Sequence, residues 1–224
     1  AYVRRQTAEP PLTLEVERLG RETDGVPEMG FAHASPAMAL MFALLSGLML
    51  STMLVEERRD GTLYRLLTAP VRSSELVVAN LGFRFLVGMA QVWFLLGFGA
   101  LVFGVDWGDS AAGLLLVTGS YVAAVSGLSV LIGSLSNSSR KAGTIALTAS
   151  LTMSALGGLW WPLEITPEVY QRIGHMVPTG WAMDAMHNLV SRGYPLAGVL
   201  TQVFVLLGFA VVFCTAAVAA FRRQ

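Results

Sequence analysis

The side chains that commonly carry catalysis are few and scattered in this chain. The three histidines, His33, His175 and His187, do not form the His-Glu-x-x-His pattern of a helical zinc site. The single cysteine, Cys214, excludes an internal disulfide and a thiolate metal cluster, and we expect it to be a small packing residue. The sequence has neither a Gly-x-Ser-x-Gly elbow nor paired carboxylates within an apolar stretch. These residues predict no metal centre and no hydrolase site.

Energy for any transport must also come from outside this chain. A nucleotide-binding loop of the form Gly-x-x-x-x-Gly-Lys-Ser/Thr is not found in the sequence. Ion-coupled carriers usually place Asp, Glu, His or Arg at membrane depth, and we expect the cores of the apolar stretches to hold none. We therefore expect a protein that is not itself an ATPase and that receives its energy from a partner.

The most distinctive polar segment reads Glu-Glu-Arg-Arg-Asp-Gly-Thr-Leu-Tyr-Arg-Leu-Leu-Thr-Ala-Pro and runs from Glu56 to Pro70. Gly61 permits a sharp change of direction, and Asp60 or Thr62 can cap a new helix. Three leucines then share one helical face at i, i+3 and i+4; they are Leu63, Leu66 and Leu67. The pattern predicts a short amphipathic helix over residues 56–72, which suits either a docking site for a cytoplasmic partner or an interfacial helix that binds lipid alone.

The elements on either side of this segment are long and apolar. Of all residues 54% are hydrophobic and 13% are charged, which is too apolar for an ordinary soluble domain. Crossing about 30 Å of hydrocarbon takes roughly 20 apolar residues as a helix, and five stretches free of Asp, Glu, Lys and Arg reach that length: Met29 to Val55, Phe85 to Val105, Ser110 to Ser139, Ala142 to Leu163 and Gly193 to Phe221. The sequence predicts an all-α polytopic membrane helix bundle with five transmembrane helices.

Orientation follows from the basic residues, which concentrate in short cytoplasmic loops. Arg58, Arg59, Arg65 and Arg72 follow the first span, with Arg84 at the mouth of the second; Arg140 and Lys141 follow the third, and Arg222 and Arg223 follow the last. These three regions are predicted to be cytoplasmic, which places residues 1–35 and 162–193 outside. Ser73 or Ser74, followed by Glu75, can start the helix that leads into the second span. The start of the chain lacks a signal peptide and an initiating Met, so we expect a missing upstream helix. Residues 1–30 are interpreted as the tail of an extracytoplasmic domain, with a disordered leader as the alternative.

The tract from 162 to 191 predicts a pair of short helices on the outer side. Thr166 as a cap and Pro167 at the first helical position favour a first helix with an apolar face, and Thr179 can cap a second, with Pro178 at the joint. Trp160, Trp161 and Trp181 suit interfacial depth, where indole rings are favoured. This pair is either an external gate or an aromatic anchor without a transport role.

Two motifs carry a resemblance to a known family. The run from Glu57 to Pro70, followed by Ser-Ser-Glu-Leu, resembles the signature of the ABC transporter permeases of the type-2 exporter family, which carry an acidic-basic run, Gly-Thr, a Leu pair and Pro directly after their second helix. The second is Gly-Gly-Leu-Trp-Trp-Pro ending at Pro162, with Pro167 and then Pro-Thr-Gly-Trp ending at Trp181, which is similar to that family's outer re-entrant element. The similarity covers residues 30 to 224, a permease domain of residues 31–224, in a family with six helices. Where the family often has Lys shortly before the helix that corresponds to the stretch from Phe85 to Val105, this chain has Asn80.

The resemblance implies a permease subunit of an ATP-driven exporter in the bacterial inner membrane, with its C-terminus in the cytoplasm. It implies a cytoplasmic ABC ATPase that binds ATP and Mg, a second permease subunit, and no cofactor or nucleic acid on this chain. Coupling to the ATPase is assigned to Glu56, Glu57, Gly61, Thr62, Leu63, Leu66, Leu67 and Pro70. The outer gate is assigned to Trp161, Pro162, Pro167, Pro178 and Trp181.

The residues leave the substrate and the function class open. A drug, a lipid and a polysaccharide all remain candidate substrates. The alternative functions are a non-transporting membrane assembly or sensor protein that binds a cytoplasmic partner, and an ion-driven carrier, which the missing intramembrane charges disfavour.

Overall fold

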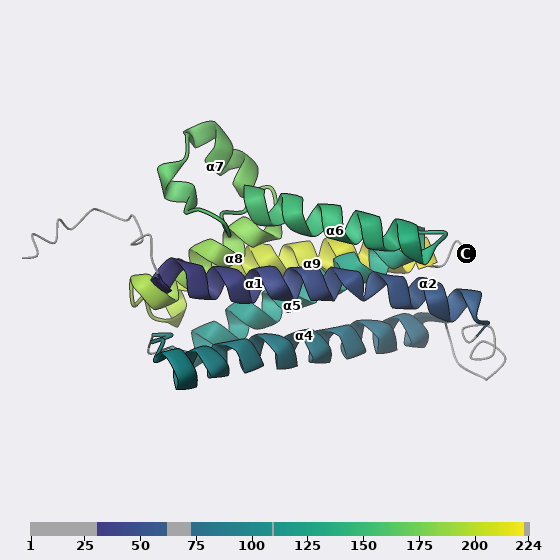
Figure 1. The fold of residues 1–224 in the computed structure, drawn as a ribbon, viewed down its shortest axis with the longest axis horizontal. Helices are drawn as coiled ribbons and strands as arrows, with labels where there is room; N and C mark the ends of the chain where they lie inside the picture. Colours follow the sequence, from purple (N-terminus) through teal and green to yellow (C-terminus); the bar gives the residue numbers. More distant parts are fainter. Residues whose placement is uncertain (1–30, 62–72, 109, 222–224) are drawn as a thin grey trace, which may run out of the picture.

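A computed structural model describes residues 31–61, 73–108 and 110–221 (Figure 1). The predictions for residues 1–30 lie outside this part of the chain, as do those for Thr62, Leu63, Leu66, Leu67 and Pro70. Within the described residues every regular element is helical, which confirms the all-α class. The helices that run along the bundle are α1 (Phe31–Met49), its continuation α2 (Ser51–Arg59), α4 (Ser73–Phe103), α5 (Ala111–Leu135), α6 (Ser139–Leu156) and α9 (Leu200–Phe221).

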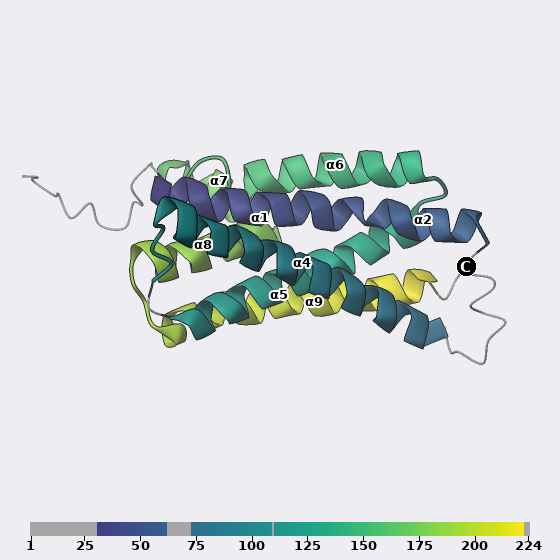
Figure 2. The same ribbon diagram turned by 60° about the horizontal axis from the view of Figure 1, so that its bottom comes forward.

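Shorter elements connect α6 to α9 at one end of the bundle. They are the 3₁₀ helix η1 (Leu163–Ile165), α7 (Glu168–Gly174), α8 (Pro178–Met186), the π-helix η2 (His187–Ser191) and the 3₁₀ helix η3 (Leu196–Val199). Figure 1 shows α7 standing off to one side of the bundle, at the end opposite the tip of α2. In both Figure 1 and Figure 2, α1 lies between α6 and α4. The bundle thus has two distinct ends, one with the α2 tip and one with the short helices.

Four described helical segments are long and apolar enough to cross a membrane: Ala34–Arg59, Glu75–Phe103, Ala111–Leu135 and Leu196–Phe221. The protein is therefore a multi-pass membrane protein, but the predicted count of five spans is not confirmed. The apolar stretch from Ala142 to Leu163 does not form one helix, because α6 ends at Leu156 and Gly158 then takes a backbone φ of +77°. Such a positive φ favours glycine and turns the chain away from the helix axis.

Helix α5 forms the centre of the bundle. In its most apolar window 67% of the residues are buried, against 17% in α4. Glycines let neighbouring helices approach: a Cβ on Gly47 of α1 would lie 2.6 Å from Val125 Cγ1, and one on Gly127 would lie 2.9 Å from Cys214 Sγ in α9. Close approach through small residues is how membrane helices gain packing energy, since lipid tails are as apolar as the helices themselves.

Arg84 is the main departure from the expected charge distribution. Helix α4 begins at Ser73, as the serines there suggest, so Arg84 lies inside the helix rather than at its mouth. Its side chain is only 3% exposed, and it donates hydrogen bonds to Ser129 Oγ of α5 at 3.3 Å and to Asn80 Oδ1 at 3.2 Å. The expectation that the helix cores hold no ionisable group is therefore wrong here. Asn80 serves as an acceptor for this buried cation.

Candidate functional site

The first predicted site lies at the tip of α2. This helix continues the direction of α1 and ends at Arg59, with Asp60 as its C-cap residue. Gly61 takes a φ of +72°, and its N–H donates to the Arg58 carbonyl at 3.2 Å. The change of direction predicted at Gly61 is confirmed. Glu56 and Glu57 lie in the last turns of α2, so the described part of the predicted 56–72 helix is the end of α2 and a turn.

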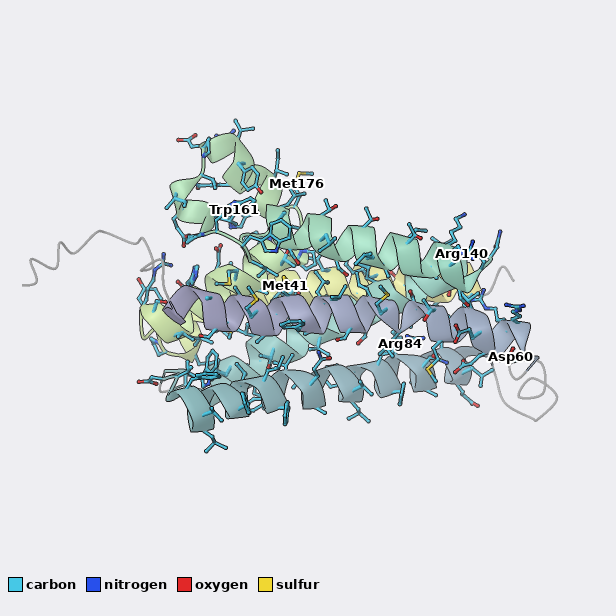
Figure 3. The ribbon with its side chains drawn as sticks, viewed as in Figure 1. Met41, Asp60, Arg84, Arg140, Trp161 and Met176 are labelled. Carbon is cyan, nitrogen blue, oxygen red and sulfur yellow. The ribbon has the colours of Figure 1, made fainter. Side chains whose placement is uncertain are left out.

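Basic residues surround this tip. Figure 3 shows Asp60 and Arg140 at the same end of the bundle, away from Trp161 and Met176. The guanidinium of Arg58 lies over the ring of Phe221, at the end of α9, with 5.9 Å between its carbon and the ring centroid. Three helix ends, from α2, α6 and α9, therefore meet at one pole of the molecule, and α2 and α6 bring arginines to it.

The second predicted site, at the opposite pole, is built on close backbone contacts. Thr179 Oγ1 donates to the Met153 carbonyl of α6 at 2.7 Å, and a Cβ on Gly157 would collide with Thr179. A Cβ on Gly174, the last residue of α7, would lie 2.7 Å from the Leu156 carbonyl oxygen. A Cβ on Gly180 of α8 would likewise collide with the Gly174 carbonyl oxygen. The ends of α6, α7 and α8 thus form one tightly packed joint, which we call the glycine joint: Gly157, Gly174, Thr179 and Gly180.

The predicted helix starts need correction in detail. Helix α7 begins at Glu168, with Pro167 in the N-cap position, and the Thr166 hydroxyl donates to the Leu163 carbonyl at 2.6 Å instead of capping. Helix α8 begins at Pro178, which leaves Thr179 inside the helix and bonded to α6. In both cases the hydroxyl donates a hydrogen bond to a carbonyl in a neighbouring turn or helix, as Ser and Thr side chains commonly do. The existence of two short helices is confirmed.

Helix α8 is a core element rather than a surface one. Met183 and Met186 are 2% and 0% exposed, and Pro178 is buried. Helix α7 instead exposes Val169, at 68%, and the turn after it exposes Met176, at 73%. Only the first helix of the predicted outer pair therefore offers an apolar face to its surroundings.

The tryptophans of this pole bind to specific protein groups. Trp181 Nε1 donates to the His175 carbonyl at 2.7 Å, and its ring meets the His175 ring edge-to-face at 5.0 Å between centroids. Trp161 packs between Trp160 and Tyr170, with centroid distances of 5.9 and 6.3 Å. Trp160 Nε1 reaches the Met41 Sδ of α1 at 3.4 Å, which links the short helices to α1. Pro162 is buried before η1, and Pro167 is exposed before α7.

Beneath these rings lies a network of charges, which we call the outer ionic network: Glu164, His175, Asp184, His187 and Arg192. His175 Nε2 lies 2.6 Å from Asp184 Oδ2. Glu164 Oε1 lies 3.3 Å from Nδ1 of His187, which is 1% exposed, and 3.6 Å from Arg192 Nη2. Both histidines look scattered in the sequence, because the network joins residues up to 28 positions apart in chain order. The charged residues within this otherwise apolar tract are the sequence feature that could have indicated the network.

The electrostatics favour a protonated imidazole at His175. Its Nδ1 lies 2.7 Å from the Gln171 carbonyl, which can only accept, and its Nε2 faces the Asp184 carboxylate. Burial lowers the pKa of His175, but these two hydrogen bonds, together with charge attraction from Asp184 and Glu164, outweigh it and raise that pKa above its ordinary value. Burial raises the pKa of Asp184, against the opposing effect of His175. Burial also acts to raise the pKa of Glu164, yet hydrogen bonding and charge attraction from His187, with a further contribution from Arg192, hold it below its ordinary value.

The two predicted sites do not come together, because they lie at opposite poles. Helices α1 and α2 connect them, and the apolar segment Ala34–Arg59 has 26 residues, a length of roughly 39 Å at 1.5 Å per residue. Near its middle, Ser46 Oγ donates to Gln91 Oε1 of α4 at 2.5 Å, and Gln91 Nε2 donates to the Phe42 carbonyl at 3.3 Å.

Comparison with known proteins gives one family and several relatives. Residues 4–219 match the family described as ABC-2 family transporter protein. The chain is similar to the linearmycin resistance permease protein LnrN of Bacillus subtilis, with 25% identity over 206 residues that cover 92% of this chain and 53% of that protein. It is also similar to the probable multidrug ABC transporter permease YbhS of Escherichia coli, with 20% identity over 79% of this chain and 47% of that protein. The inner membrane transport permease YhhJ of Escherichia coli is 24% identical over 98% of this chain and 58% of that protein. The chain therefore spans about half the length of these curated relatives.

Proposed function

Because the chain belongs to the ABC-2 family of transporter proteins, we propose that it is the permease part of an ATP-driven exporter. In this proposal a cytoplasmic ABC ATPase binds ATP and Mg, and this chain binds no cofactor of its own. The pole with the α2 tip faces the cytoplasm of a bacterial cell, together with the C-terminus, as the clustering of arginines there favours. A second permease subunit completes the pathway.

The observation that carries the proposal is the turn at Gly61. Helix α2 carries Glu56 and Glu57 on its last turns, and it ends at Arg59, close to the left-handed backbone at Gly61. In this proposal the leucine-containing segment that follows in the sequence contacts the ATPase. We assign contact with the ATPase to Glu56, Glu57 and Gly61, and to the segment over 62–70 that holds Leu66 and Leu67.

The path from this contact to the opposite pole runs through α1. Because α2 continues α1, a force on the α2 tip acts on the whole of Ala34–Arg59. Helix α1 contacts Trp160 through Met41, and the glycine joint then connects α6 to α7 and α8. We assign the outer gate to this joint and its flanking residues, Trp161, Pro162, Pro167, Pro178 and Trp181. The outer ionic network holds the gate closed when its charges are paired.

An apolar cavity between α1 and α4 supports a proposal for the substrate class. It has a volume of about 240 Å³, and its mostly apolar lining includes four aromatic rings: Phe42, Phe98, Phe103 and Trp107. Ligand cavities with such linings bind apolar molecules and use few polar groups for orientation. The names of two relatives refer to linearmycin resistance and multidrug transport. We propose a hydrophobic drug or lipid as the exported molecule.

The test is copurification of the full-length protein from its native host in mild detergent. We expect a phosphate-loop ATPase to be retained by the wild type and lost from Leu66→Asp, because a carboxylate on the apolar face opposes docking. An ATPase retained equally by Leu66→Asp would refute the coupling role of this segment. No ATPase in either sample would refute the exporter and favour an assembly or sensor protein.

A matched pair of glycine variants tests the turn itself. Gly61 and Gly104 have φ values of +72° and +64°, and a Cβ on either meets nothing within 4 Å, so alanine adds similar strain at both. We expect Gly61→Ala to lower ATPase stimulation by the permease while Gly104→Ala leaves it unchanged. Equal effects of the two variants would contradict a special role for Gly61.

A further inference from the structure

A polar cavity opens beside the α2 tip. It has a volume of about 490 Å³, and it lies between the end of α2 and the turn that joins α5 to α6. Its lining consists of Val55, Arg58, Arg59, Ser136, Asn137, Ser138 and Ser139. Among these described residues the two arginines are the charged members, so the lining is positive.

The position of Arg58 is set by packing. Both arginines lie in the last turn of α2, one after the other. The Arg58 guanidinium stacks over Phe221 at 5.9 Å, an arrangement that stabilises the cation and restricts its rotation. Arg59 is exposed at the rim. A planar guanidinium held in this way presents fixed donors, and such donors match the oxygen geometry of a phosphate group.

The opposite wall is the start of α6, an 18-residue helix. Ser138 is its N-cap, and the Ser138 Oγ accepts the N–H of Lys141 at 3.3 Å. The first amides of a helix have no intrahelical acceptor, and the helix dipole adds positive potential at this end. Ser138 and Ser139 line the cavity, so an anion between α2 and α6 would meet cationic donors on one side and a helix N-terminus on the other.

Ser136 supplies an independent indication of a ligand. Its side chain is 1% exposed, and within the described part of the chain its Oγ has no hydrogen-bond partner. A buried hydroxyl without a partner is unfavourable, and Ser136 lines this same cavity. An oxygen ligand in the cavity would provide the missing acceptor.

We propose that this cavity, where the arginines at the end of α2 face the serines before α6, binds a phosphate group. The favoured source is the headgroup of an anionic phospholipid, because Val55 at the cavity wall belongs to a segment that is apolar enough to cross a membrane. Free phosphate shares the chemistry and is the other source. The phosphate site is formed by residues of this chain, so this proposal does not rest on the ATP-driven export proposed above.

The experiment uses the delipidated full chain in neutral detergent at fixed ionic strength. Dioleoylphosphatidylglycerol, dioleoylphosphatidylcholine and sodium phosphate are titrated separately, and binding is followed by the thermal unfolding midpoint and by native mass spectrometry. The variants are Arg58→Gln and Ser136→Ala. The matched control is Arg140→Gln, which removes the same charge from the same pole but does not line the cavity.

We expect phosphatidylglycerol to bind saturably and more tightly than phosphatidylcholine. Arg58→Gln should raise its apparent Kd about tenfold and Ser136→Ala about threefold, in line with the loss of a charged and a neutral hydrogen bond, while Arg140→Gln changes it less than about twofold. The same pattern with sodium phosphate, and none with phosphatidylglycerol, would support the phosphate site and assign it to the free anion. If Arg58→Gln fails to fold, as judged by circular dichroism, the apparent Kd of Ser136→Ala tests the proposal instead.

Three results would overturn the proposal. The first is that neither phosphatidylglycerol nor phosphate binds saturably. The second is that Arg140→Gln weakens binding as much as Arg58→Gln does, which would indicate a diffuse surface charge. The third is that Arg58→Gln releases a copurifying protein without changing phosphatidylglycerol or phosphate binding, which would assign the arginines to a protein contact.

Discussion

Replacing Gly180 with alanine tests the glycine joint directly. A Cβ at this position collides with the carbonyl oxygen of Gly174 and would lie 2.9 Å from its carbonyl carbon. Both are backbone atoms, so the strain is relieved only when α7 moves relative to α8. Gly208 in α9 is the matched control, because a Cβ there meets nothing within 4 Å.

The expected magnitudes follow from two opposing terms. Overpacking costs about 1–3 kcal/mol, and a backbone collision belongs at the upper limit of about 3 kcal/mol. Alanine in place of glycine within a helix recovers about 1 kcal/mol. Gly180→Ala should therefore lower the free energy of unfolding by about 2 kcal/mol, while Gly208→Ala raises it by up to about 1 kcal/mol. For a chain of this size the two midpoints should differ by roughly 6–12 °C.

The assay is thermal unfolding in detergent at one scan rate, followed by tryptophan fluorescence. Trp181 donates to the carbonyl of His175, next to Gly174, so its emission also reports the joint. We expect an altered native emission spectrum in Gly180→Ala and an unchanged one in Gly208→Ala. Coincident midpoints and spectra for the two variants would refute the tight joint.

Two further predictions concern the outer ionic network. Glu164→Gln should lower the free energy of unfolding by about 1–3 kcal/mol, because His187 and Arg192 lose their carboxylate partner. Glu168→Gln is the control: its ion pair with Arg172 is exposed, so this variant should change the free energy of unfolding by less than about 0.5 kcal/mol. Equal changes for the two variants, measured by chemical denaturation, would contradict the network. The raised pKa of His175 means that the folded state binds its proton more tightly, so this contribution to stability is complete below the unfolded pKa of about 6.5 and is lost as the pH rises through the folded value. The difference in unfolding midpoint between wild type and His175→Asn should shrink between pH 5.5 and pH 9, and a difference that is constant or grows with pH would rule this out.

Local patterns predicted the elements of this fold well. The turn at Gly61, the start of α4 after the serines and the two short helices after Pro162 were readable because each depends on residues within a few positions. The helix starts at Thr166 and Thr179 were wrong in detail, because the hydroxyls bond to carbonyls that the fold brings near. Side-chain type alone does not distinguish a cap from such a bond.

The polar contacts between helices were beyond local reasoning. Arg84 was expected at a helix mouth, since the start of an apolar run does not mark the start of a helix. The outer ionic network was missed because Glu164 meets His187 and Arg192 only after α7 and α8 fold back on α6. The motif from Glu57 to Pro70 identified the family from residue type and spacing, but its leucines lie outside the described residues.

The contacts at the middle of Ala34–Arg59, the segment formed by α1 and α2, can act as a pivot for this segment. Ser46 lies close to the midpoint of Ala34–Arg59, where it bonds to Gln91, and the neighbouring Gly47 lies against Val125 of the central helix. A rod of roughly 39 Å that is held at its centre moves its two ends in opposite directions. A tilt of about 5° displaces each end by about 1.7 Å at 1.5 Å of rise per residue. In the proposed coupling, an inward push at the α2 tip becomes an outward swing of the Ala34 end, and Met41, which contacts Trp160 closer to the pivot, moves by about 0.7 Å.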